Sequence, residues 1–84
     1  MSLTTGSLEA VSYKGEIRTV YVLNVFEGKL HVLECKDMTQ AQVDMLEESI
    51  EQAQDPMKFY EDMKADLRKF YRTFHADKVE ELQG

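Results

Sequence analysis

The sequence predicts an α+β domain in which a three-stranded antiparallel β-meander is followed by two α-helices and a short C-terminal helical turn. The first half of the chain holds runs rich in Val, Tyr, Phe and Leu, separated by glycine-containing pairs. The second half has apolar residues at helical spacing after clear helix-start signals. We therefore expect a single domain over residues 1–84, with the β-meander in 8–37 and the helical part in 38–84.

The three strands are expected at Leu8–Tyr13, Glu16–Phe26 and Lys29–Cys35. Lys14-Gly15 and Glu27-Gly28 separate them. Glycine readily adopts the positive φ that two-residue hairpin turns require, so both pairs are typical of tight β-hairpins. The long second strand is therefore predicted at the centre of the sheet.

The second hairpin also predicts how its strands pair. With Glu27-Gly28 at the tip, Val25 lies opposite Leu30, Leu23 opposite Val32, and Tyr21 opposite Glu34. The other face of the two strands then carries Val20, Val22, Asn24, Phe26, His31, Leu33 and Cys35. Because both faces are partly apolar, we expect something to cover the second face, either more of this chain or another copy of it.

The first helix is predicted to begin at an N-cap at Thr39, with Gln42 completing a capping box. Asp55 and Pro56 end this helix and start the next, as N-cap and first helical residue. The apolar face of the first helix is expected to hold Val43, Leu46, Ile50 and Ala53.

The second helix is predicted to run from Pro56 to near His75. Seven apolar residues fall within about 120° of arc at helical spacing, and they predict its packing face. These residues are Phe59, Tyr60, Met63, Leu67, Phe70, Tyr71 and Phe74. Asp77 is expected to cap a short final turn that holds Val79 and Leu82.

Composition narrows the class of function. The chain has 84 residues and a formal net charge of −6, which makes it a poor candidate for binding nucleic acid or an anionic membrane. Its one cysteine excludes an intramolecular disulfide and favours a reducing compartment, so we expect a cytoplasmic location. We find no signal-peptide pattern and no apolar run long enough for a membrane span.

Residues with catalytic or metal-binding chemistry are few. The two histidines are His31 and His75, and Cys35 is the only thiol. On one strand, His31 and Cys35 would lie about 13 Å apart, too far for a Cys–His pair or a shared metal ion. The four glycines stand singly rather than in a phosphate-binding loop. We therefore expect no enzyme activity, no metal and no cofactor.

The first predicted helix carries most of the negative charge. Residues 38–57 contain five acidic residues and no Lys or Arg, which gives −5 of the net −6. Four of them, Asp44, Glu47, Glu48 and Glu51, share one side of the helix. This pattern favours a non-enzymatic adaptor or inhibitor that binds a basic surface of a partner protein. Mimicry of nucleic-acid charge is a narrower version of the hypothesis, and solubility is the competing explanation.

Two alternatives stay open. Lys64, Arg68 and Arg72 step by four along the second predicted helix, forming a basic edge. This edge is a solvated face, a partner for the acidic helix of the same or a neighbouring chain, or a nucleic-acid-binding site. The other alternative is a homodimeric assembly module, because the apolar stripe and the two-sided sheet exceed what one small core requires.

Overall fold

A five-stranded antiparallel sheet forms the body of the molecule, and a helical segment between β3 and β4 packs on it. The computed structural model describes residues 3–82, so residues 1–2 and 83–84 of the expected domain lie outside the described part. The strands are β1 (Leu8–Tyr13), β2 (Glu16–Phe26), β3 (Lys29–Glu34), β4 (Tyr71–His75) and β5 (Glu80–Glu81). The helices are α1 (Gln40–Glu51), α2 (Pro56–Asp62) and α3 (Lys64–Leu67), with 3₁₀ turns η1 (Arg68–Phe70) and η2 (Ala76–Lys78). The α+β class is therefore confirmed, but the sheet is larger than the predicted meander.

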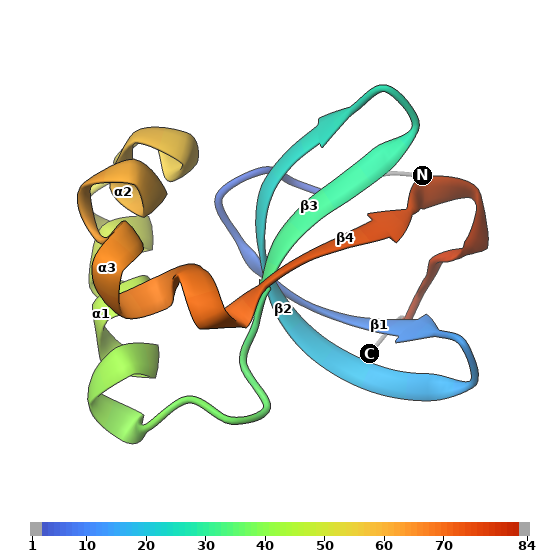
Figure 1. Cartoon of the computed structure of the whole chain (residues 1–84), viewed down its shortest axis with the longest axis horizontal. Coiled ribbons are helices and arrows are strands. Elements are labelled where there is room, and N and C mark those ends of the chain that lie inside the picture. The colour runs from blue at the N-terminus through green and yellow to red at the C-terminus, as the bar shows by residue number, and fades with distance from the viewer. Residues whose placement is uncertain (1–2, 83–84) are drawn as a thin grey trace.

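The strand order is β4-β3-β2-β1-β5, so the predicted meander forms the middle of the sheet. Figure 1 shows the three helices grouped at one side of the molecule, with the strands crossing on the other side. The two edge strands, β4 and β5, are joined only by the short turn η2. Both edges of the sheet are thus supplied by the last 12 described residues, 71–82, which the sequence had suggested were helical.

The predicted hairpins are confirmed. β1 and β2 have the expected bounds, and β3 ends at Glu34, one residue earlier than predicted. Lys14 and Gly15 have φ values of 52° and 77°, and Glu27 and Gly28 have 53° and 72°. Two consecutive positive φ angles define the tight turn whose twist matches that of the flanking strands.

The pairing of β2 with β3 differs from the prediction because β2 contains an irregularity between Val22 and Asn24. Val25 pairs with Leu30 as expected, but Val22, not Leu23, pairs with Val32. Tyr21 therefore lies opposite Leu33 rather than Glu34. An extra residue in one strand shifts every later pair by one position and changes which face each side chain occupies. The expected face assignments are wrong beyond this point, and Leu33 joins the side chains on the helix side.

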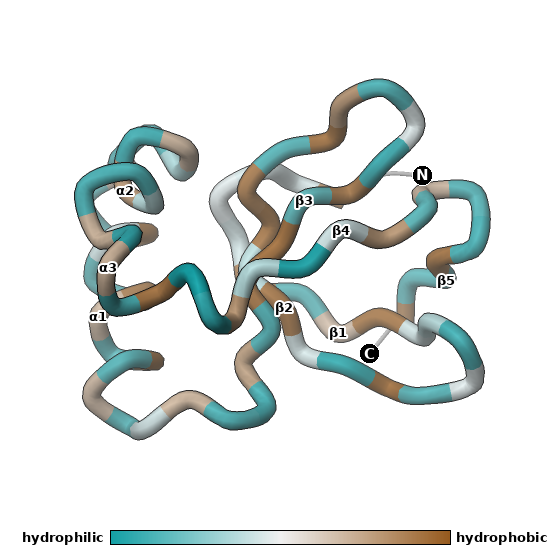
Figure 2. Tube along the Cα trace, viewed as in Figure 1, coloured by the Kyte–Doolittle hydropathy of each residue, from teal (hydrophilic) through white to brown (hydrophobic). Residues whose placement is uncertain are grey.

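Each face of the sheet packs into its own hydrophobic core. The core on the face away from the helices, which we call the inner cluster, contains Val11, Tyr13, Val20, Val22, Leu30, Val32, Phe74 and Val79. The helix-side cluster contains Tyr21, Leu23, Leu33, Leu46, Phe59, Tyr60, Leu67 and Phe70, with Cys35 packed against it. Figure 2 shows the corresponding pattern, with hydrophobic positions recurring along the strands between hydrophilic ones. The sequence predicts that something covers the second face of the sheet, and residues of this same chain bury that face.

The long second helix is the main error of the sequence prediction. The chain is helical only in short pieces from Pro56 to Phe70, and Tyr71–His75 forms β4 against β3. The predicted stripe is divided as a result, since Phe70 packs on the helix side and Phe74 packs in the inner cluster. Aromatic and β-branched residues suit a strand at least as well as a helix, and pairing with β3 gives them backbone partners. The prediction of a final helical turn is also wrong, because the 3₁₀ turn η2 ends at Lys78 and Glu80–Glu81 form β5.

Helix α1 begins as predicted. Thr39 is its N-cap and forms a full capping box with Gln42, and Asp55 caps α2 with Pro56 in its first turn. Ala53 is not on the helix face: it lies past the C-cap with a φ of 52°. The face is completed instead by Ser49, which is buried and lies 3.0 Å from the Tyr21 hydroxyl, Oγ to Oη. This hydrogen bond joins α1 to the centre of β2.

We predict that the Tyr21–Ser49 hydrogen bond stabilises the docking of α1. Tyr21→Phe and Ser49→Ala each leave a buried hydroxyl without its partner, so each should lower the free energy of unfolding by about 1–2 kcal/mol. The double variant should lose less than the sum of the two, by roughly 1 kcal/mol. Urea unfolding of the four proteins measures this coupling, and strictly additive losses would contradict it.

Candidate functional site

The acidic face, which we define as Asp44, Glu47, Glu48 and Glu51, lies on the exposed side of α1. Leu46 and Ser49 are buried on the opposite side of the same helix and hold it against the sheet. The buried residues thus set the direction in which the four carboxylates point. Because the helix is capped and docked, the acidic face is presented on a defined scaffold rather than on a loose loop.

The acidic face has no ion-pair partner within residues 3–82. Its described hydrogen bonds come from neutral amides: Gln40 Nε2 donates to Asp44 at 2.9 Å, and Gln52 Nε2 donates to Glu48 at 3.1 Å. Within residues 3–82, no Lys or Arg forms an ion pair with any of the four carboxylates. The arrangement can therefore attract cationic groups from outside the chain.

The basic edge predicted from the sequence is not a line on one helix. Lys64 lies in α3, Arg68 in η1 and Arg72 in β4, although all three are exposed. Arg72 Nη1 donates to the backbone oxygens of Lys69 and Tyr71, at 3.0 and 2.7 Å. The structure thus breaks the predicted spacing, and in the described chain the three cations do not pair with the acidic face.

The two histidines and the cysteine have separate partners. His31 Nδ1 lies 2.5 Å from the Tyr71 hydroxyl, and the His75 backbone N–H donates to the Tyr13 hydroxyl at 3.3 Å. Burial, assisted by the nearby Glu34 carboxylate, raises the pKa of the Cys35 thiol to about 11. The thiol is therefore protonated near neutral pH and is a poor nucleophile. No group of three metal-ligating side chains is found within residues 3–82.

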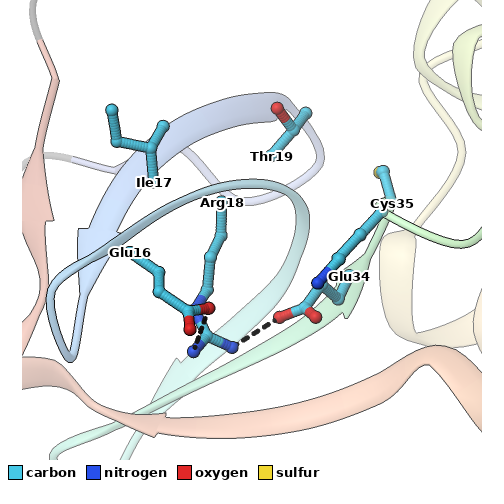
Figure 3. Close-up of a pocket in the computed structure, with 7 residues that line it drawn as sticks. Glu16, Ile17, Arg18, Thr19, Glu34 and Cys35 are labelled. Atoms are coloured by element: carbon cyan, nitrogen blue, oxygen red, sulfur yellow. Dashed lines mark hydrogen bonds and ion pairs between the residues drawn. The ribbon is translucent and has the colours of Figure 1, made fainter.

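A second feature, which sequence reasoning missed, is centred on Arg18 at the start of β2. Its guanidinium bonds Glu34 Oε2 at 2.9 Å and Glu16 Oε2 at 3.1 Å, as Figure 3 shows. It also lies over the rings of Tyr13 and Phe74, at 5.7 and 5.4 Å from their centroids. Two carboxylates already balance the cation, so this arrangement links β2 to the end of β3 rather than offering a free positive charge.

A cavity of about 540 Å³ adjoins this ion-pair group. Its lining residues are Glu16, Ile17, Arg18, Thr19, Glu34, Cys35 and Lys36. In Figure 3, Ile17 and Thr19 point to the side opposite Arg18, as alternate residues of a strand do. No sequence motif marks this place, because it arises where β3 ends beside a longer β2.

Comparison with protein-family models, with curated proteins and with solved structures finds no match to this chain. A function must therefore be argued from the surfaces themselves. In the described part of the chain, no helix has the length and apolar character that crossing a membrane requires.

We predict that Cys35 is protected from alkylation in the folded protein. A rise in its pKa from 9.0 to about 11 lowers the thiolate fraction at pH 8 by about 100-fold. Iodoacetamide labelling should be slower by a similar factor than in the urea-unfolded chain, and it should accelerate as the pH rises toward 11. Equal labelling rates in the folded and unfolded protein at pH 8 would contradict the assignment.

Proposed function

We propose that this protein is a non-enzymatic interaction module, of the adaptor or inhibitor class, that binds a basic surface of a partner protein through the acidic face of α1. The observation that carries the proposal is the set of four exposed carboxylates without a cationic partner in residues 3–82. The proposal includes a cytoplasmic location, which the single cysteine supports.

The spacing of these carboxylates supports recognition. Asp44 and Glu48 are four residues apart on α1, as are Glu47 and Glu51. Each like-charged pair costs an exposed helix about 0.2–0.5 kcal/mol. A cationic partner surface would relieve this repulsion on binding and would be steered to the helix from a distance. Mimicry of a nucleic-acid backbone is the narrower form of the proposal, in which the partner's basic surface is a nucleic-acid-binding groove.

The other two functions have less support. Nucleic-acid binding by Lys64, Arg68 and Arg72 has to act from three separate elements of an acidic protein. Assembly through surplus apolar surface has little support, because most apolar residues of the predicted second helix and of both sheet faces are buried in the two cores. The large apolar side chains that stay exposed are Ile17, Val25, Phe26 and Leu82.

The test is affinity capture from native lysate at low salt and at about 0.5 M salt, where exposed charges are strongly screened. The triple variant Glu47→Lys, Glu48→Lys, Glu51→Lys should lose a partner that wild type captures at low salt. Its capture by wild type should weaken in high salt. Circular dichroism should stay unchanged, because the substituted positions are exposed.

A matched control separates the acidic face from net charge. Glu27, Asp77 and Glu80 are exposed and lie in the β2–β3 turn, in η2 and in β5, away from the helices. Their replacement by Lys changes the net charge by the same amount but should leave capture intact. Equal capture by wild type and the α1 variant would overturn the proposal. A duplex-DNA or RNA gel shift that Arg68→Glu abolishes would favour the nucleic-acid alternative instead.

A further inference from the structure

Strand β2 has an open flank near its start, although it lies in the middle of the sheet. Its pairing with β3 ends where Val20 meets Glu34, and the Cys35 N–H then donates to the Thr19 carbonyl at 3.0 Å. Beyond this bond the chain leaves the sheet toward α1. The first three residues of β2, Glu16–Arg18, are therefore paired with β1 alone.

The register shows which backbone groups face this flank. Tyr13 and Glu16 flank a two-residue turn, so they form a hydrogen-bonded pair across β1 and β2. The Val22 N–H donates to Ser7, so the even-numbered residues of this half of β2 turn their backbone groups toward β1. Ile17 consequently turns its N–H and C=O toward the open flank. Its side chain is 74% exposed.

We propose that a second copy of this chain adds to the open flank of β2, as an antiparallel strand related by a two-fold axis through Ile17. Each Ile17 then donates its N–H to the Ile17 carbonyl of the other copy. This places the Glu16 side chain of one copy opposite Arg18 of the other, twice over, because antiparallel pairing about residue 17 matches residue 16 with residue 18. The strand is thus complementary in charge to itself.

The ion pairs of Arg18 make a second copy a suitable occupant. Arg18 bonds Glu16 through Nη2 and Glu34 through Nη1 of its own chain. Glu16 has a side chain that is 66% exposed, so it can reach across the two-fold axis. Two copies can therefore exchange their Glu16 carboxylates, and each Arg18 keeps two carboxylate partners in the dimer.

The open flank carries only part of the protection that sheet edges usually have. Such edges are usually blocked by Lys, Pro, a bulge, an inward-pointing charge or a covering segment. Lys36 lines the cavity beside the flank and Arg18 points inward, but residues 16–18 contain no Pro and no bulge. Ile17 is instead an exposed β-branched residue beside a cavity of about 540 Å³. By contrast, the edge strand β5 is only two residues long, which itself limits pairing.

Disulfide trapping tests the register directly. In a Cys35→Ser background, Ile17→Cys places two thiols on the two-fold axis, where the Cα atoms of a hydrogen-bonded pair are about 5.5 Å apart. Oxidation should give a covalent dimer at least about tenfold faster than with Val25→Cys, which lies in the same strand and is also exposed. Equal trapping rates for the two variants would overturn the proposal.

Sedimentation of the protein without added cysteines gives an independent readout. The mass should rise with concentration between about 10 µM and about 1 mM. Ile17→Pro removes an N–H that β1 does not use, so it should keep the fold and raise the dimer dissociation constant at least about tenfold. Ile17→Thr, which keeps the N–H, should weaken the dimer less. A wild-type monomer throughout, or an unchanged dimer with Ile17→Pro, would refute the inference. If Ile17→Pro unfolds, disulfide trapping decides.

Discussion

The structure depends on one constraint: β2 is apolar on both faces and needs a cover on each. Val20 and Val22 face the inner cluster, while Tyr21 and Leu23 face the helices. The ordinary alternation of side chains along the strand lets β2 serve both cores. The irregularity between Val22 and Asn24 then places Val25 on the face of Leu30. A small domain has little surface to spare. Residues 40–70 cover one face of the sheet, and Phe74 and Val79 complete the core on the other face.

This division of the chain decides which surfaces remain for recognition. Most large apolar side chains pack in the two cores, and those that stay exposed are Ile17, Val25, Phe26 and Leu82. The charged face of α1 and the short flank of β2 remain as surfaces for recognition. The Tyr21–Ser49 bond and the burial of Leu46 hold α1 in place and leave its carboxylates outside. A docked helix loses little further conformational freedom on binding, which favours its use as a recognition surface. The flank of β2 exists for a different reason, since β3 ends five residues after it begins.

Local signals predicted the parts of the fold that local chemistry determines. The glycine pairs located both hairpins, and Thr39, Gln42, Asp55 and Pro56 located both helix starts. Strand β4 was missed because its aromatic residues continue a helical spacing, and only the unpaired edge of β3 makes the strand preferable. The irregularity in β2 was not predicted because no Gly marks its position in the sequence. Helical spacing predicted the shared exposed side of Asp44, Glu47, Glu48 and Glu51 on α1, and their role in binding stays a prediction. The Arg18 group was not, because it joins residues from β2 and β3 with rings from β1 and β4.

The central claim is that this chain covers both faces of its own sheet, with β4 sealing the edge of β3. Amide hydrogen exchange, followed by NMR at low protein concentration, tests it most directly. In β4, the N–H groups of Arg72 and Phe74 should exchange slowly because they face β3, whereas the N–H of Thr73 should exchange quickly. In β2, the N–H of Val20 should be slow and that of Ile17 fast. Uninterrupted slow exchange from residue 60 to residue 74, as one continuous helix from Pro56 would produce, would contradict the account.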